Sequence, residues 1–166
     1  MPYTLAELSD MNQSAFVAAL GDVFEETPDI AAQVWVSRPF ADVAELHQHM
    51  VAVVQGCDRA AQLTLIQAHP DLGSRVNMAE SSVQEQASVG LNQLSPSEYD
   101  YIHQLNRAYK EKFGFPFIIA VRNHTKASIF AAFEERLQNP IDREIDRALQ
   151  EIYQIAQSRL LDKVIH

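Results

Sequence analysis

Apolar residues recur at three- and four-residue spacing through most of this 166-residue chain, which is the pattern of amphipathic helices. In the stretch from 141 to about 164, the apolar positions are Ile145, Ala148, Leu149, Ile152, Ile155, Ala156 and Leu160. Comparable stretches occupy residues 29–36, 42–55, 59–68, 96–113 and 126–138. A further helix is expected to carry Phe16, Val17, Leu20 and Phe24.

Residues that start and stop helices divide this pattern into separate elements. Capping-box spacing, in which a Ser or Thr precedes a Glu by three positions, occurs at Thr4, Ser82 and Ser95. Thr27 before Pro28 predicts a cap followed by proline at the first helical position. Further candidate N-caps are Asn12, Asp58 and Thr125, and the candidate stops are Gly56, Gly114 and Asn139-Pro140. We therefore expect about eight to nine helices.

The stretch 115–121, Phe-Pro-Phe-Ile-Ile-Ala-Val, departs from the helical pattern. Its composition is compatible with a buried strand. A single strand would have no partner, so we expect a buried, extended segment between helices. No linker, internal repeat or low-complexity tract interrupts the chain. The predicted fold is an all-α, single-domain bundle over residues 1–166.

Composition and charge exclude several classes of partner. A hydrophobic fraction of 47% indicates a globular protein, and no apolar run approaches the roughly 20 residues of a membrane span. The net charge of -9 argues against nucleic-acid binding. A single cysteine, Cys57, excludes an internal disulfide and suits a reducing compartment. With no signal in residues 1–10 and no peroxisomal ending at 163–166, we expect a cytoplasmic protein.

A histidine stands where one of the predicted helices must stop, in Ala68-His69-Pro70-Asp71-Leu72-Gly73. Pro70 disfavours helical geometry at His69, and the residues that follow favour a turn. An imidazole beside helix C-terminal carbonyls is favoured in its protonated form and can act as acid or base near neutral pH. A helix cap or a surface residue remains an alternative interpretation of His69.

Glu85 and Arg159 are the other candidates for chemistry. Glu85 would raise the pKa of the His69 imidazole and fix its orientation, although a capping box with Ser82 accounts for it by itself, and the two roles can coexist. A helix start there would also offer backbone N–H groups to an anion. The guanidinium of Arg159 can hold a carboxylate or imide through two hydrogen bonds, unless it is a solvated residue near a helix C-terminus.

The segment 115–119 is a candidate pocket wall, because non-helical backbone N–H and C=O groups can bind a polar ring. The alternative is plain core. No metal site is expected: His47 and His49 are two positions apart, and no ligand cluster of helical spacing surrounds His69. Cys57 fits a small residue at a helix junction better than a nucleophile.

Together these stretches resemble the 2-oxo-4-hydroxy-4-carboxy-5-ureidoimidazoline (OHCU) decarboxylases of uric acid breakdown, over nearly the whole chain. The motifs that carry the resemblance are Ala68–Gly73, Ser82–Gln86 leading into Gly90-Leu91, Phe113–Ile118, Trp35 with Arg38-Pro39-Phe40, and Ile152–Leu160. The run 87–90 departs from the alanine- and glycine-rich family pattern, and the loop 73–81 is idiosyncratic.

The resemblance implies a cofactor-free, all-α lyase that acts on a small molecule, forms a homodimer and makes S-allantoin. By motif position, it implies that His69 and Glu85 are catalytic. Residues that would bind polar groups of the substrate are Ser82, Gln86 and Arg159, and residues that would line the pocket are Pro70, Phe117 and Ile119.

The chemistry of OHCU suits such a site. One ring carbon carries a hydroxyl and a carboxylate beside a C=N bond, which can accept the electrons released as carbon dioxide leaves. Our hypothesis is that His69, positioned by Glu85, handles the hydroxyl proton. Two alternatives remain: a non-catalytic acidic helical interaction module, and a cofactor-free lyase or hydrolase acting on a related ureide.

Overall fold

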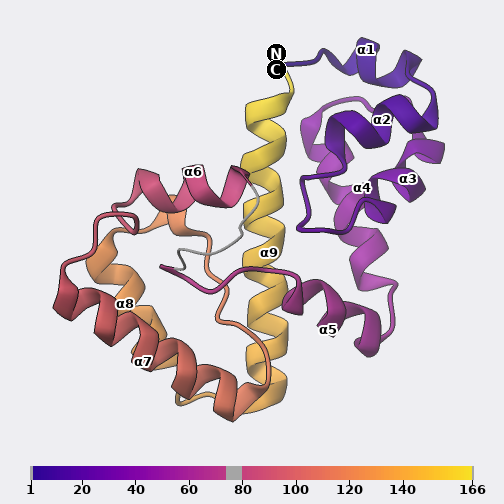
Figure 1. The fold of residues 1–166 in the computed structure, drawn as a ribbon. Helices are drawn as coiled ribbons and strands as arrows, with labels where there is room; N and C mark the ends of the chain where they lie inside the picture. Colours follow the sequence, from indigo (N-terminus) through magenta and orange to yellow (C-terminus); the bar gives the residue numbers. More distant parts are fainter. Residues whose placement is uncertain (1, 74–79, 166) are drawn as a thin grey trace. The chain divides into compact units, whose positions relative to one another are not determined.

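The computed structural model describes residues 2–73 and 80–165, in which the chain forms nine α-helices, two short 3-10 helices and no strand (Figure 1). The all-α prediction is confirmed. The chain divides into two compact units: unit 1 comprises Met1–Ala68 and Tyr153–His166, and unit 2 comprises His69–Ile152. The single domain over 1–166 stays a prediction. Among the described helices, none combines the length and the apolar character that crossing a membrane requires.

Unit 1 contains helices from both ends of the chain. They are α1 (Leu5–Asp10), α2 (Gln13–Leu20), α3 (Asp29–Val34), the 3-10 helix η1 (Trp35–Ser37), α4 (Val43–Gln55), α5 (Arg59–Gln67) and the C-terminal part of α9 (Ile141–Lys163). Helix α3 packs against α2 and α4 around a core that includes Phe16 and Leu46. Near the chain ends, Tyr3 N–H donates to Lys163 C=O at 2.7 Å, which joins the two terminal segments.

Unit 2 holds most of the candidate site. Its elements are α6 (Glu80–Ser88), α7 (Pro96–Phe113), the 3-10 helix η2 (Val121–Asn123), α8 (Lys126–Arg136) and the N-terminal part of α9. Helix α6 packs against η2, and α7 packs against α8. The prediction of a buried, non-helical segment is confirmed for residues 115–120, whereas Val121, also buried, already belongs to η2. The rings of Phe117 and Phe133 stack with centroids 3.9 Å apart.

Most of the predicted helix starts are confirmed. Five predicted caps accept a hydrogen bond from the first turn of a helix: Thr4, Asn12, Asp58, Ser95 and Thr125. Asp42, which was expected to be the first residue of its helix, is instead the N-cap of α4. The glycine stop of α7 is also confirmed, since Gly114 has a positive φ of 80°. Local sequence therefore determines these boundaries, because each cap satisfies a backbone donor that the helix itself leaves unpaired.

Several predicted boundaries are wrong. Helix α6 already includes Glu80, so Ser82 lies inside it rather than at its cap. Pro28, not Thr27, occupies the cap position of α3, and the Thr27 hydroxyl donates to Glu25 C=O at 2.7 Å. Helix α2 ends at Leu20, so its predicted residue Phe24 is buried beyond the helix; α3 and α8 each stop two residues early. Spacing alone does not separate a cap from an interior position.

Removing the Ser95 hydroxyl should destabilise the protein by about 1 kcal/mol. In the capping box of α7, Ser95 Oγ accepts from Glu98 N–H at 3.2 Å, and Glu98 Oε1 accepts from Ser95 N–H at 2.9 Å. Urea denaturation of Ser95→Ala against the wild type measures this loss. Unchanged stability would show that the box contributes nothing.

The Glu98 half of this box should be sensitive to pH. Hydrogen bonds from Ser95 N–H and from Lys126 lower the pKa of Glu98 below its ordinary value. Since the folded-state pKa is lowered, the contribution of Glu98 is present above that ordinary value and is lost as the pH falls through the lowered one. The stability difference between wild type and Glu98→Gln should therefore shrink from neutral pH to about pH 3. An equal difference at both pH values would contradict this.

Candidate active site

His69 is a buried residue directly after a helix. Helix α5 ends at Gln67, Ala68 is its C-cap, and His69 follows with 9% of its surface exposed. The predicted helix stop before Pro70 is therefore confirmed, and the interpretation of His69 as a surface residue is wrong.

The residues after Pro70 are fixed to α6 and α7 by side-chain hydrogen bonds. Asn106 Nδ2, on α7, donates to Leu72 C=O at 2.9 Å. Gly73 N–H donates to Gln86 Oε1, on α6, at 3.0 Å. Because both bonds are buried, they hold the chain a few residues from His69 in one position against two helices.

Gly73 should tolerate no side chain. Its φ of 69° lies in the left-handed region, and an added Cβ would come 3.2 Å from both Ile102 and Leu94 side chains. Gly73→Ala should cost about 1–3 kcal/mol from backbone strain, and more if these contacts cannot relax. Gly114→Ala is the matched control, because Gly114 has a φ of 80° and an added Cβ there would meet no atom within 4 Å. Equal losses of urea stability in the two variants would mean that crowding at Gly73 contributes nothing.

Ser82, Glu85 and Gln86 share one face of α6, since they are three and four positions apart. Ser82 and Gln86 are buried, and Glu85 is half-buried. The side-chain oxygen of Gln86 accepts the hydrogen bond from Gly73 N–H, so Gln86 fixes the position of the segment that follows His69. The structure thus ties the α6 face to the segment that carries His69. The His69–Glu85 pairing itself stays a prediction.

Some backbone groups of the segment 115–121 have no hydrogen-bond partner in the described part of the chain. Phe117 and Ile119 are 1% and 3% exposed. Within the described residues, their backbone N–H and C=O groups make no hydrogen bond. Buried backbone groups are almost always paired, so these four groups are suited to a polar ligand. The side chains of Phe117 and Ile119 are part of the core, as the alternative interpretation expected. Their backbone groups, which have no hydrogen bond to a described residue, are consistent with the predicted pocket wall.

Arg159 lies in unit 1 and is buried there, with 4% of its surface exposed. Its Nη2 donates to Glu25 Oε1 at 2.9 Å, and Nη1 donates to the carbonyls of Asp22 and Val23 at 3.3 Å. The interpretation of Arg159 as a solvated residue is therefore wrong. Glu25 fixes the orientation of the Arg159 guanidinium. The role of Arg159 in binding substrate stays a prediction.

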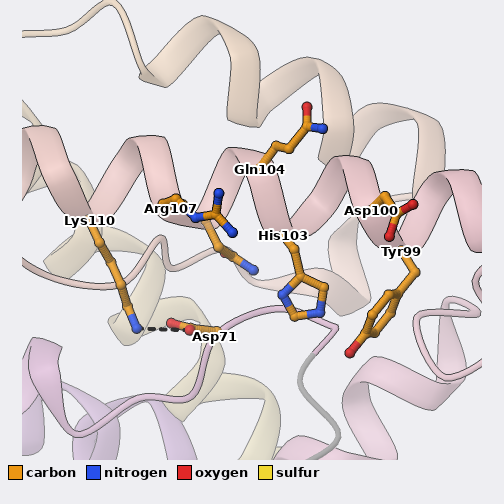
Figure 2. A pocket seen from close by; sticks show the side chains of 8 residues that line it. Asp71, Tyr99, Asp100, His103, Gln104, Arg107 and Lys110 are labelled. Carbon is orange, nitrogen blue, oxygen red and sulfur yellow. Dashed lines mark hydrogen bonds and ion pairs between the residues drawn. The ribbon is translucent and has the colours of Figure 1, made fainter.

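A pocket of about 660 Å³ lies beside α7, on the side to which Tyr99, His103 and Lys110 extend (Figure 2). It is lined by Asp71, Tyr99, Asp100, His103, Gln104, Asn106, Arg107 and Lys110. Lys110 Nζ pairs with Asp71 Oδ2 at 2.8 Å. The lining contains none of the predicted site residues, and no motif in the sequence indicated this pocket.

Three buried charged residues of unit 2 were also missed: Arg136, Glu144 and Glu151. A signal was present for Arg136, because it continues the apolar stripe of Ile129 and Phe133 at helical spacing. A charged residue on such a stripe is rarely buried unless it is paired.

Other chemistry-bearing side chains have structural partners. His47 Nε2 lies 2.8 Å from Tyr153 C=O, and Cys57 Sγ donates to Val53 C=O at 3.2 Å, as expected of a helix-junction residue. In the described part of the chain, no three His, Cys, Asp or Glu side chains are grouped so that they could hold a metal ion. Independence from cofactors stays a prediction.

Comparison with known proteins agrees with the resemblance over the whole fold. The family model for OHCU decarboxylase matches residues 9–161. The 2-oxo-4-hydroxy-4-carboxy-5-ureidoimidazoline decarboxylase of Halalkalicoccus jeotgali is 41% identical over 157 residues, which cover 95% of this chain and 89% of that protein. The enzyme of the same name from Haloferax volcanii is 40% identical, covering 96% of this chain and 95% of that protein.

Solved structures show the same relationship. A crystal structure of (S)-allantoin synthase superposes with a TM-score of 0.81 at 29% identity, covering 99% of this chain and 54% of that chain. This protein therefore spans about half the length of that solved chain. The matches in sequence and in structure together place this chain in the OHCU decarboxylase family.

Proposed function

We propose that this protein decarboxylates OHCU to allantoin in uric acid breakdown, as a carboxy-lyase. Family membership supports this activity. The observation in the structure that carries the proposal is the hydrogen bond from Gly73 N–H to Gln86 Oε1, because it ties the His69 segment to the helix face that bears Glu85.

His69 is the proposed acid–base group. As the bond between the ring carbon and the carboxylate breaks, carbon dioxide leaves and the electron pair forms a double bond to the neighbouring carbon. The electrons of the C=N bond move to its nitrogen, which takes up a proton. His69 accepts the proton of the substrate hydroxyl, which becomes the carbonyl of allantoin. A proton added to one face of the neighbouring carbon completes the reaction. Glu85 holds the imidazole of His69 in the required orientation.

The remaining site residues bind and orient the ring. The backbone N–H and C=O groups of Phe117 and Ile119 hydrogen-bond the polar edge of the substrate, which supports delivery of the proton to one face and hence S-allantoin. Arg159, oriented by Glu25, binds a carbonyl or the carboxylate. Ser82 binds the ureido group, Gln86 contributes its amide, and Pro70 lines the pocket. Such fixed donors act on charge that develops as carbon dioxide leaves.

The resemblance also supports three further proposals: a homodimer, a cytoplasmic location and a reaction without cofactor. The C=N bond of OHCU supplies the electron sink that a cofactor would otherwise provide. Light scattering coupled to gel filtration tests the dimer, and activity after exhaustive dialysis against a chelator tests metal independence.

Substrate profiling separates this function from its alternatives. Freshly made OHCU, allantoin and 5-hydroxyisourate are each incubated with the protein, and their disappearance is compared with buffer alone. We expect acceleration for OHCU only. Acceleration for one of the other two compounds would favour a related ureide enzyme, and no acceleration for any would favour a non-catalytic helical module.

A further inference from the structure

Arg136 holds the extended segment at two points. Its Nη1 donates to Ile118 C=O at 2.6 Å, and its guanidinium carbon lies 4.3 Å from the centre of the Phe117 ring. The ring of Phe133 also stacks on the Phe117 ring. Phe117 is therefore fixed by both an arginine and an aromatic partner, and the carbonyl next to it is fixed by the same arginine.

Glu144 orients Arg136 in turn. Glu144 Oε1 accepts from Arg136 Nε at 2.9 Å and from the Tyr109 hydroxyl at 2.7 Å, and Asn139 donates to Oε2 at 2.9 Å. Arg136 and Glu144 are 5% and 0% exposed. Burial and the bond to Glu144 raise the pKa of Tyr109, so its hydroxyl stays a donor across the physiological range. Every bond that Glu144 accepts reduces the freedom of the Arg136 guanidinium.

A second buried carboxylate fixes the same edge of the segment. Glu151 Oε1 accepts from Ala120 N–H at 3.1 Å. Ile118 C=O and Ala120 N–H are two residues apart, so in an extended segment they project from one edge. The backbone groups of Phe117 and Ile119 then project from the opposite edge, and these are the groups without a hydrogen bond in the described residues.

We propose that Arg136, oriented by Glu144, is a positioning residue for the decarboxylation. It fixes one edge of the 117–120 backbone so that the Phe117 and Ile119 groups on the other edge face the substrate. The inference rests on the proposed function. Neither Arg136 nor Glu144 is among the predicted site residues. The positioning role explains why this ion pair is buried beside an otherwise apolar segment.

Comparing arginine with lysine at position 136 distinguishes a positioning role from simple charge compensation, because only arginine has a planar set of several donors. Arginine donates to Glu144 through Nε and to Ile118 C=O through Nη1 at the same time. Lysine keeps the charge opposite Glu144 but lacks this planar set of donors. A purely structural pair would be rescued by Arg136→Lys, whereas a positioning residue would not.

The test compares Arg136→Lys, the neutral pair Arg136→Met with Glu144→Gln, and Ile129→Val. Ile129 is fully buried on the same helix and has no polar side-chain atom, so it controls for loss of packing. Each variant is measured for its thermal midpoint, for kcat and KM with OHCU, and for the enantiomeric excess of allantoin by circular dichroism. The neutral pair leaves no uncompensated buried charge, so the comparison survives if Arg136→Lys fails to fold.

We expect both Arg136 variants to lower kcat by about 10- to 100-fold and to reduce the enantiomeric excess, because a displacement near 1 Å costs up to about 100-fold. Ile129→Val should lower the thermal midpoint while kcat and enantiomeric excess stay at wild-type values. Wild-type kcat and enantiomeric excess in a folded Arg136 variant would overturn the positioning role. Racemic product from the wild type would overturn the proposed function itself, so the two failures are distinguishable.

Discussion

Replacing His69 with asparagine lowers kcat for OHCU by about 10²- to 10⁴-fold, which is the usual contribution of a positioned acid–base group. Asparagine has a similar shape and retains a hydrogen-bonding side chain, but it cannot exchange a proton near neutral pH. Because His69 is buried, the variant also needs its thermal midpoint measured beside its turnover. Stopped-flow absorbance of freshly made OHCU gives kcat.

His49→Asn is the matched control for His69→Asn. His49 lies on α4 in unit 1, its side chain is 38% exposed, and it pairs with Glu45 at 3.7 Å. Its replacement should leave kcat and KM at wild-type values. If His69→Asn retained wild-type turnover while folded, the acid–base role would have to be assigned to another group.

Replacing Arg159 with alanine should have the largest effect on stability, a loss of about 3–5 kcal/mol, since it removes the guanidinium from a buried ion pair with Glu25. Glu25 is 3% exposed, and its Oε1 lies 2.9 Å from Arg159 Nη2. Urea denaturation of the variant measures the loss. A loss below about 1 kcal/mol would contradict this prediction, because it would show that the pair contributes no more to stability than an exposed ion pair does.

Binding and stability can be separated at this position. In the double variant Arg159→Met with Glu25→Gln, both charges are removed, so most of the lost stability should return. The KM for OHCU should nevertheless stay raised, because the guanidinium that we propose binds the substrate is gone. A wild-type KM in the double variant would remove Arg159 from the substrate site.

Much of the fold could be predicted because its determinants are local. The capping box at Ser95 and the glycine at 114 specify the ends of α7, and both act within a few residues of themselves. The extended segment 115–121 was predicted from the lack of any partner strand. Its burial agrees with that expectation, as do the backbone groups of Phe117 and Ile119, which have no hydrogen bond to any described residue.

The parts that were missed depend on contacts between distant residues. Glu25 and Arg159 are 134 positions apart, so no spacing rule connects them. The Ser82 capping box failed for a different reason: residues three apart share a helix face at any position, and the same pattern occurs inside α6. The hydrogen bond from Arg136 to Ile118 C=O joins α8 to the segment 115–120. The residue pattern within each of these two elements does not reveal this contact.

The most direct test of the proposed function is the chirality of the product. OHCU decays without catalyst to racemic allantoin, so circular dichroism distinguishes enzymatic from spontaneous decarboxylation. With freshly made OHCU, the wild-type protein should give S-allantoin in large excess at an accelerated rate, and His69→Asn should give a much smaller excess at a rate lowered by about 10²- to 10⁴-fold. Racemic allantoin from the wild type, formed no faster than in buffer, would contradict the proposed function.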